Sequence, residues 1–137
     1  MDNDTNKIFA ISSAALQAQD QRLKIIAENI ANANTTASSP TGQPYRRQVI
    51  TFKNEFDKAL GANKIKVGGV STDKSAFSRK YDPSNPAADK DGYVQMPNVQ
   101  PLTEMMDMHD AQRSYEANLD VIEAARTMMV HTIGLLQ

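Results

Sequence analysis

The stretch LTEMMDMHDAQRSYEANLDVIEAARTMMVHTIGLL, residues 102–136, decides the fold of this chain. Apolar side chains recur in it every third or fourth residue, and neither glycine nor proline interrupts it before Gly134. This pattern is typical of one long amphipathic α-helix, and its near-heptad spacing is that of helices that wind around a partner. A helix of this length measures about 50 Å and cannot bury its apolar stripe against itself. We therefore expect the stretch to pack against other helices.

A second amphipathic helix is predicted over residues 5–33. Its apolar side chains project onto one face and its charged side chains onto the other. At about 43 Å it has nearly the same reach as the C-terminal helix. Because the chain is expected to leave the middle region where it entered it, the two helices should pair antiparallel as a coiled-coil-like hairpin. The predicted fold class is mainly α with a small β-rich insert.

The middle of the chain, residues 34–101, is predicted to be turn-rich with a few short strands. Tyr45–Phe52 and Ala76–Tyr81 have the composition of strands, Phe56–Leu60 suggests a helical turn stopped by Gly61, and Gly68-Gly69 suits a hairpin turn. The predicted organisation is an N-terminal helix (1–33), a small β-rich middle segment (34–101) and a C-terminal helix (102–137), with the two helices forming one core domain.

Composition narrows the class of protein. The chain has 137 residues, 40% of them hydrophobic and 23% charged, with a formal net charge of −1 and no cysteine. A near-neutral chain gives no electrostatic reason to expect a nucleic acid or an anionic membrane as partner. No apolar run reaches the roughly 20 residues of a membrane span, and the acidic N-terminus does not resemble a cleaved secretory signal. We expect neither a transmembrane helix nor a cleaved signal peptide.

Candidate chemical groups are few. The only histidines, His109 and His131, are interpreted as solvated or interface residues, because Asp107 and His109 at i, i+2 on a helix do not face each other. Glu104 and Asp107 are interpreted as acids that favour the helix N-terminus. Phosphate-binding and nucleophile motifs are absent from the sequence. We therefore predict no catalytic residue, no metal and no cofactor, and not an enzyme.

Two further features have more than one interpretation. The basic pair Arg46-Arg47 beside Tyr45 is weak evidence for nucleic acid, and a contact to a neighbouring subunit is favoured. The methionines near the two ends of the C-terminal helix suit seam packing and adaptation to a partner equally well. Two helices alone bury too little apolar surface to offset the entropy of ordering them, so we expect them to be poorly ordered in a monomer.

The terminal sequences resemble the signatures of bacterial flagellar axial proteins. ISSAALQAQDQRLKIIAENIANANTT at the N-terminal end is similar to the helix that closes with an NIANANT-type turn. QRSYEANLDVIEAARTMM followed by IGLL is similar to the matching C-terminal signature. Between them, PYRRQVITF and YDPSNPAADKDGYVQMPNVQPLTEMMDM resemble the proximal-rod proteins of the flagellar basal body, the FlgC type. The resemblance covers nearly the whole chain.

This resemblance implies a structural role and a location. Asn29, Ile30, Ala31, Asn32 and Asn34 match the N-terminal turn, and Ser114–Asn118 match the C-terminal core motif. In the family these segments form an inner tube of antiparallel helices. The implied partners are copies of the chain, other rod and basal-body proteins, and the type III export apparatus, which passes the chain unfolded. The implied location is the basal-body rod crossing the periplasm, where the rod transmits torque for motility.

Alternatives to a FlgC-type subunit are another proximal-rod axial subunit and, from a different class, an autonomous coiled-coil adaptor or export chaperone that dimerises alone. The polar residues Gln19, Gln112 and Arg126 are expected to set the register of helix packing. The predicted assembly interface comprises the residues Ile8, Ile11, Leu16, Gln19, Leu23, Ile26, Asn29, Ile30, Asn32, Met105, Met108, Gln112, Tyr115, Asn118, Leu119, Ile122, Arg126, Met129, Ile133 and Leu136.

Overall fold

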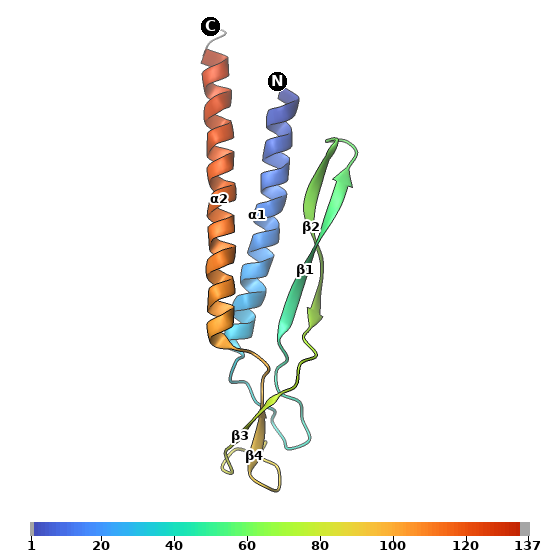
Figure 1. Cartoon of the computed structure of the whole chain (residues 1–137), viewed down its shortest axis with the longest axis vertical. Helices are drawn as coiled ribbons and strands as arrows, with labels where there is room; N and C mark the ends of the chain where they lie inside the picture. The colour runs from blue at the N-terminus through green and yellow to red at the C-terminus, as the bar shows by residue number, and fades with distance from the viewer. Residues whose placement is uncertain (1, 135–137) are drawn as a thin grey trace. The chain divides into compact units, whose positions relative to one another are not determined.

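A computed structural model of the chain describes residues 2–134 (Figure 1). Its elements in chain order are α1 (Asp2–Ala31), β1 (Gln48–Asp57), β2 (Ala62–Thr72), β3 (Ser78–Tyr81), β4 (Tyr93–Met96) and α2 (Pro101–Gly134). The predicted class, mainly helical with a small β region, is confirmed. Neither α1 nor α2, over the residues described, combines the length and the apolarity needed to cross a membrane.

The two helices have 30 and 34 residues. α1 ends where Asn32 folds back, its backbone N–H and its side-chain amide both donating to the Glu28 carbonyl, at 3.1 and 2.9 Å. This contact supplies a partner for one of the carbonyls that a helix end leaves open. α2 begins at Pro101, because proline is well tolerated in the first turn, where its missing N–H has no helical partner.

Two small sheets complete the fold. β1 and β2 form a two-stranded hairpin, and β3 pairs with β4 antiparallel in the register Ser78 with Met96 and Tyr81 with Tyr93. Tyr81 and Tyr93 meet edge to face with ring centroids 5.3 Å apart. The predicted strand over residues 76–81 therefore exists, in a shorter form.

The turn between β1 and β2 lies elsewhere than predicted. Phe56 belongs to β1, and the turn spans the residues after Asp57, where Gly61 N–H donates to the Asp57 carbonyl at 2.8 Å. The helical turn predicted at Phe56–Leu60 is present one residue later, as the single hydrogen-bonded turn Asp57–Gly61, and Gly61, with a φ of +63°, ends it as predicted. The hairpin turn predicted at Gly68-Gly69 is wrong. Both glycines lie within β2, where a Cβ on Gly68 would come within 2.7 Å of Lys53 Cγ and Gly69 adopts a φ of 153°. Gly68 is required because the Lys53 side chain crosses over it, and Gly69 because of its backbone conformation. Neither glycine reverses the chain.

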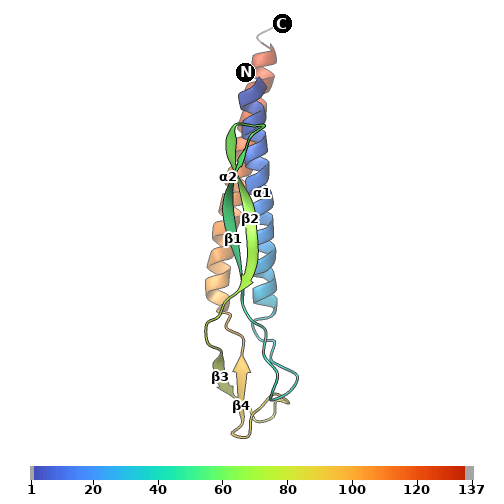
Figure 2. The same ribbon diagram turned by 90° about the vertical axis from the view of Figure 1, so that its right-hand side faces the viewer.

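The chain forms two compact units. The hairpin unit consists of Met1–Leu23, Thr51–Gly69 and His109–Gln137, and the junction unit of Lys24–Ile50 and Val70–Met108. Within the hairpin unit, α1 and α2 run side by side in opposite directions and the β1–β2 hairpin lies along the other side of α1 (Figures 1 and 2). The predicted antiparallel pairing of the helices is thus confirmed.

The buried side chains of the helices are mostly small. In the hairpin unit the buried apolar residues are alanines, namely Ala15, Ala18, Ala111 and Ala125. In the junction unit the buried apolar residues are Ile26, Ala33, Ala87, Val94 and Val99. Alanines allow close helix approach but bury little area, at about 25 cal/mol per Å² of apolar surface. Most of the large apolar side chains of α2 consequently remain outside the core of the chain.

Replacing Gly92 should destabilise the junction unit. Gly92 has a φ of +81°, and a Cβ there would lie 2.8 Å from Tyr81 Cε2 and 3.2 Å from Pro83 Cβ. We expect Gly92→Ala to lower the free energy of unfolding by about 1–3 kcal/mol, because strain and a steric clash add. Urea unfolding followed by tyrosine fluorescence measures this. Lys90→Ala in the same turn is the control, and equal stability of the two variants would contradict the assignment.

Candidate assembly site

The most deeply buried polar side chains lie where α1 ends and α2 begins. Asn29, in the last turns of α1, and Glu104, in the first turn of α2, are each only 1% exposed. The Asn29 Nδ2 group donates a hydrogen bond of 3.0 Å to Glu104 Oε2, which joins positions 75 residues apart in the chain. A buried carboxylate needs such partners, because burying a charge without them is costly. Within the junction unit this bond fixes the end of one helix against the start of the other.

Asn29 uses its full hydrogen-bonding capacity. Its Nδ2 group also donates to the Gln48 carbonyl at 2.9 Å, while its Oδ1 accepts from the Gln48 N–H and from the Tyr45 hydroxyl, each at 2.9 Å. An amide is the side chain that offers donors and an acceptor together, so neither aspartate nor leucine can replace it. Through Asn29 the segment entering β1 is attached to both helices.

Arg47 supplies the charge that balances Glu104. Its Nε donates to Glu104 Oε1 at 2.5 Å, and its terminal nitrogens lie 3.6 Å from carboxylate oxygens of Asp73 and Asp107. Burial by itself would lower the pKa of Arg47, but the hydrogen bond to Glu104 and the three carboxylates outweigh it and raise the pKa above its usual value. The guanidinium is therefore a permanent positive charge at the centre of this cluster.

The loop before α2 completes the cluster. Asn98 Oδ1 accepts from the Arg47 backbone N–H at 2.8 Å, and its amide donates to the Asp73 carbonyl at 3.0 Å. The backbone N–H and the hydroxyl of Ser75, followed by the charge of Arg47, hold the pKa of Asp73 below its usual value. Burial and the charge of Glu28 raise the pKa of Tyr45, which keeps its hydroxyl protonated as a donor. We call Asn29, Tyr45, Arg47, Asp73, Asn98 and Glu104 the junction network.

Two sequence interpretations are corrected here. The basic pair was expected to contact a neighbouring subunit, but Arg47 binds Glu104 inside the chain. Arg46 donates to the Asp73 and Ser75 carbonyls and lies 4.1 Å above the Phe77 ring. Glu104 lies in the first turn of α2, as interpreted, but that interpretation was incomplete, because the side chain is also buried and paired with Arg47 and Asn29. Sequence reasoning missed these pairings because no local pattern links residues so far apart in the chain.

The predicted interface residues divide into three groups by exposure. Buried in the chain itself are Ile26 and Asn29; half-buried are Ile8, Ile11, Leu16, Gln19, Leu23, Ile30, Asn32, Met108, Tyr115, Asn118, Ile122 and Met129; exposed are Met105, Gln112, Leu119, Arg126 and Ile133. Leu136 lies outside the described residues. The exposed group recurs every seven residues along α2, so it forms one continuous strip. His109 and His131 are also exposed.

Large apolar side chains are exposed on two surfaces of the hairpin unit. On α2 they include Leu119, which is 45% exposed, Val130 and Ile133; on the β1–β2 hairpin they are Phe52, Phe56 and Ile65, with Phe56 59% exposed. Extended apolar patches on a soluble domain mark interaction surfaces. The β1–β2 hairpin was not among the predicted interface residues, although the alternation of Phe52 and Phe56 with polar residues was a readable signal.

Gln19 differs from the other predicted register positions. Its side-chain carbonyl oxygen is buried and, within residues 2–134, has no hydrogen-bond donor beside it. Gln112 and Arg126 are exposed instead. A buried acceptor without a partner costs about 1–3 kcal/mol. The register-setting role of Gln19, Gln112 and Arg126 stays a prediction.

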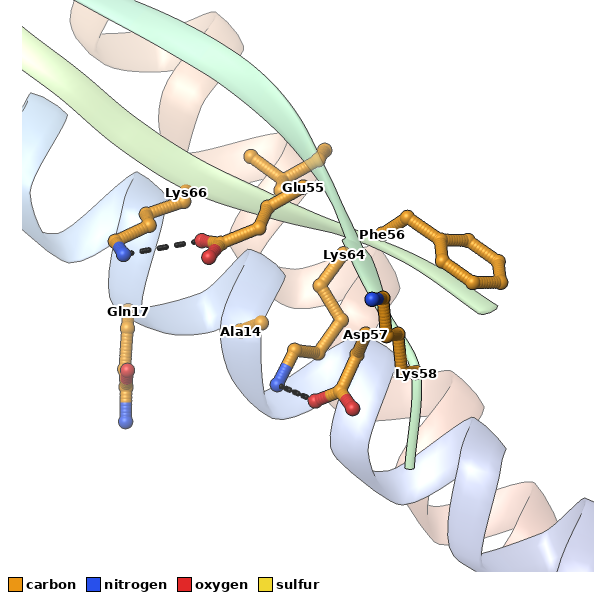
Figure 3. Close-up of a pocket in the computed structure, with 9 residues that line it drawn as sticks. Ala14, Gln17, Glu55, Phe56, Asp57, Lys58, Lys64 and Lys66 are labelled. Carbon is orange, nitrogen blue, oxygen red and sulfur yellow. Dashed lines mark ion pairs between the residues drawn. The ribbon is translucent and has the colours of Figure 1, made fainter. Parts of the chain in front are cut away.

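The hairpin unit also contains a shallow groove of about 500 Å³ between α1 and the β1–β2 hairpin (Figure 3). Ala14 and Gln17 of α1 face Lys58, Lys64 and Lys66 across it, among other residues of the hairpin. Two ion pairs, Lys64 with Asp57 and Lys66 with Glu55, lie along the groove. Across the part of the chain that the structure covers, no group of histidines and carboxylates is arranged to hold a metal ion.

Antiparallel end helices with small buried residues, and large apolar side chains left on the outside, are typical of a structural protein that packs against other chains. Two family descriptions match the sequence: "Flagella basal body rod protein" over residues 9–37 and "Flagellar basal body rod FlgEFG protein C-terminal" over residues 90–135. The chain belongs to the FlgC family of flagellar basal-body rod proteins.

Curated relatives support this membership over nearly the whole chain. The flagellar basal-body rod protein FlgC of Agrobacterium fabrum is 47% identical over 127 residues, covering 93% of this chain and 91% of the relative. FlgC of Salmonella typhimurium is 39% identical over 130 residues, covering 95% and 96%. FlgC of Bacillus subtilis is 36% identical over 140 residues, covering 91% and 93%. The family is structural, and the chain is a structural subunit of the basal-body rod.

Removing the charge of Glu104 from the junction network should destabilise the junction unit. We expect Glu104→Gln to lower its free energy of unfolding by about 3–5 kcal/mol, because Arg47 is left without its main counter-charge. Tyrosine fluorescence during urea unfolding reports this, since Tyr45, Tyr81 and Tyr93 all lie in the junction unit. The control is Lys80→Gln on exposed β3. A stability loss no larger than that of the control would contradict the role given to Glu104.

Acid should weaken the junction unit in a defined pH range. The pKa of Asp73 is lower in the folded chain than its usual value, so its contribution is complete above that value, about 4, and is lost as the pH falls through the folded pKa. Hydrogen bonds from the Tyr93 and Asp91 backbone N–H groups likewise lower the pKa of Asp89, so its contribution is lost in the same direction of pH. We expect urea midpoints to be steady between about pH 6 and 8 and to fall below about pH 4. Asp73→Asn should reduce the fall, and an unchanged pH profile in that variant would contradict this assignment.

Proposed function

We propose that this rod subunit is ordered by its neighbours: the end helices of each copy are completed by adjacent chains within a tube of antiparallel helices. The exposed strip on α2 supports this proposal most directly, because Met105, Leu119 and Ile133 leave apolar surface that the chain itself does not cover. The alanine-rich interior of the hairpin unit supports it as well, since small side chains contribute little stability to an isolated helix pair.

The lack of a dense core in the hairpin unit is also favourable for export. A chain whose long helices lack a dense core of their own is easily kept unfolded, and the sequence contains no cysteine that would form a disulfide. We propose that the chain leaves the cell unfolded through the flagellar type III export apparatus, without a cleaved signal peptide. It would then become ordered in the rod where the rod crosses the periplasm.

The mechanical role requires stiffness. Helices stiffen when their apolar faces pack continuously against neighbours, because interiors at crystal-like density resist deformation. In the proposed rod the subunit transmits motor torque through these packed helices, with other rod and basal-body proteins and copies of itself as partners. Family membership does not favour the alternative of an autonomous coiled-coil adaptor or export chaperone. The proposed role requires no chemistry at the chain, in keeping with a structural family.

Placing a charge in the exposed strip should prevent assembly. We expect Leu119→Asp to abolish incorporation into the rod and motility while leaving export largely intact, because a carboxylate would be buried at the contact with a neighbouring chain without a partner. Motility assays, secretion assays and immunoblots of purified basal bodies measure the three properties.

Leu119→Met is the matched control, since it keeps an apolar side chain of similar volume and should support swimming. Normal swimming of the Leu119→Asp strain would remove the case for the α2 strip. Loss of both export and assembly would instead indicate a defect before the rod is reached.

A further inference from the structure

The β1–β2 hairpin presents a basic and apolar surface. Its exposed large apolar side chains include Phe52, Phe56 and Ile65. Residues 51–69 carry four lysines against two carboxylates, a net charge of +2. A surface that combines exposed aromatic residues with an excess of one charge is suited to a partner that is apolar and oppositely charged.

The carboxylates of the hairpin are already used within it. Lys66 Nζ lies 3.0 Å from Glu55, and Lys64 Nζ lies 2.6 Å from Asp57 (Figure 3). The hydrogen bond from Lys64 and the backbone N–H groups of Leu60 and Ala59 lower the pKa of Asp57. These pairs stabilise the two strands against each other. The excess charge therefore resides on Lys53 and Lys58, which are both exposed.

The outer face of α2 has the opposite character. Residues 109–134 carry four carboxylates and two arginines, a net charge of −2 with neutral histidines. Glu116, Leu119, Asp120 and Glu123 are spaced three or four residues apart, so they share one face, and all are exposed. Val130 continues that face one heptad beyond Glu123. The surface offers apolar contacts flanked by three acids and by one cation, Arg126, so its charge is negative overall.

The hairpin does not reach this surface within its own chain. Its inner side contacts α1, where Ala14 and Gln17 line the groove shared with the hairpin. Two copies of the basic surface repel each other, as do two copies of the acidic surface, whereas one of each attracts. A contact between two different surfaces of identical chains is heterologous, and it propagates into a ring or a helical array when repeated.

We propose that the β1–β2 hairpin of one copy docks on the exposed acidic and apolar face of α2 of a second copy, around Leu119 and Glu123. This inference rests on the proposed function, because it assigns one contact between neighbouring copies in the rod. It goes beyond the helix packing proposed above, since it makes the β1–β2 hairpin an assembly element with the charges of Lys53 and Lys58 as specificity determinants.

Cysteine cross-linking tests the contact directly, because the natural sequence has no cysteine. Phe56→Cys and Leu119→Cys are placed in two differently tagged full-length copies, co-expressed in a flagellated bacterium from which its own copy of the gene has been deleted. Basal bodies are then treated with an oxidant or a short bismaleimide. We expect a dimer that carries both tags, and no cross-linked dimer when either variant is expressed alone.

Three outcomes overturn the proposal. Dimers from a single variant would indicate a symmetric contact, cross-links only to other basal-body proteins would indicate a different partner, and no cross-link in basal bodies that contain both variants would exclude the contact. Absence of the wild-type chain from basal bodies would instead overturn the proposed function. Tyr81→Cys, exposed on β3, is the control and should not cross-link with Leu119→Cys.

Charge reversal provides an independent measurement. With the cysteines in place, Lys58→Glu should lower the yield of the mixed dimer about fivefold or more, and Glu123→Lys in the second copy should restore most of it, because the pair then attracts again. Lys80→Glu on β3 should leave the yield unchanged. Failure of Glu123→Lys to restore the yield would contradict the assigned charge pairing.

Discussion

The hydrogen bond between Asn29 and Glu104, with Arg47 as the counter-charge, is the constraint on which the ends of the helices depend. It brings the last turns of α1, the start of β1 and the first turn of α2 into one cluster, and each buried polar atom of Asn29 has a partner there. Polar clusters of this kind contribute less to net stability than apolar packing of the same volume, but they fix a register, because any shift leaves a buried charge unpaired. Within the junction unit, this cluster fixes the end of α1 against the start of α2.

Beyond the junction, the chain stabilises its helices weakly. The buried apolar residues of the hairpin unit are alanines, while Leu119, Ile133 and Phe56 remain exposed. This distribution is unfavourable for an autonomous domain, because large apolar side chains stay in contact with water. It is suitable for a subunit, because a neighbouring chain that covers these side chains stabilises both partners. In the proposed function, neighbouring chains of the rod cover this apolar area.

Much of this fold was predictable from sequence. The periodicity of residues 102–136 and 5–33 indicated both helices, because an amphipathic repeat is a local signal. The small β region was expected, but its turn was misplaced, since Gly68-Gly69 serves a crossing side chain of Lys53 that only the pairing of strands reveals. The bond of Arg47 to Glu104 was also missed, because it links positions 57 residues apart with no pattern between them. Leu119 was predicted as an interface residue from its spacing, and it is exposed, but spacing alone did not distinguish the buried face of α2 from the exposed one.

We propose that the junction unit is already ordered in the monomer, whereas the parts of α1 and α2 outside it become ordered only when neighbouring chains pack against them. Hydrogen–deuterium exchange of the full-length chain in dilute solution, read peptide by peptide by mass spectrometry, measures this most directly. We expect slow exchange of backbone amides in residues 24–50 and 70–108, and fast exchange in α1 before Leu23 and in α2 after His109, with protection there appearing only in assembled rods. Uniformly slow exchange along both helices in the isolated monomer would contradict the account.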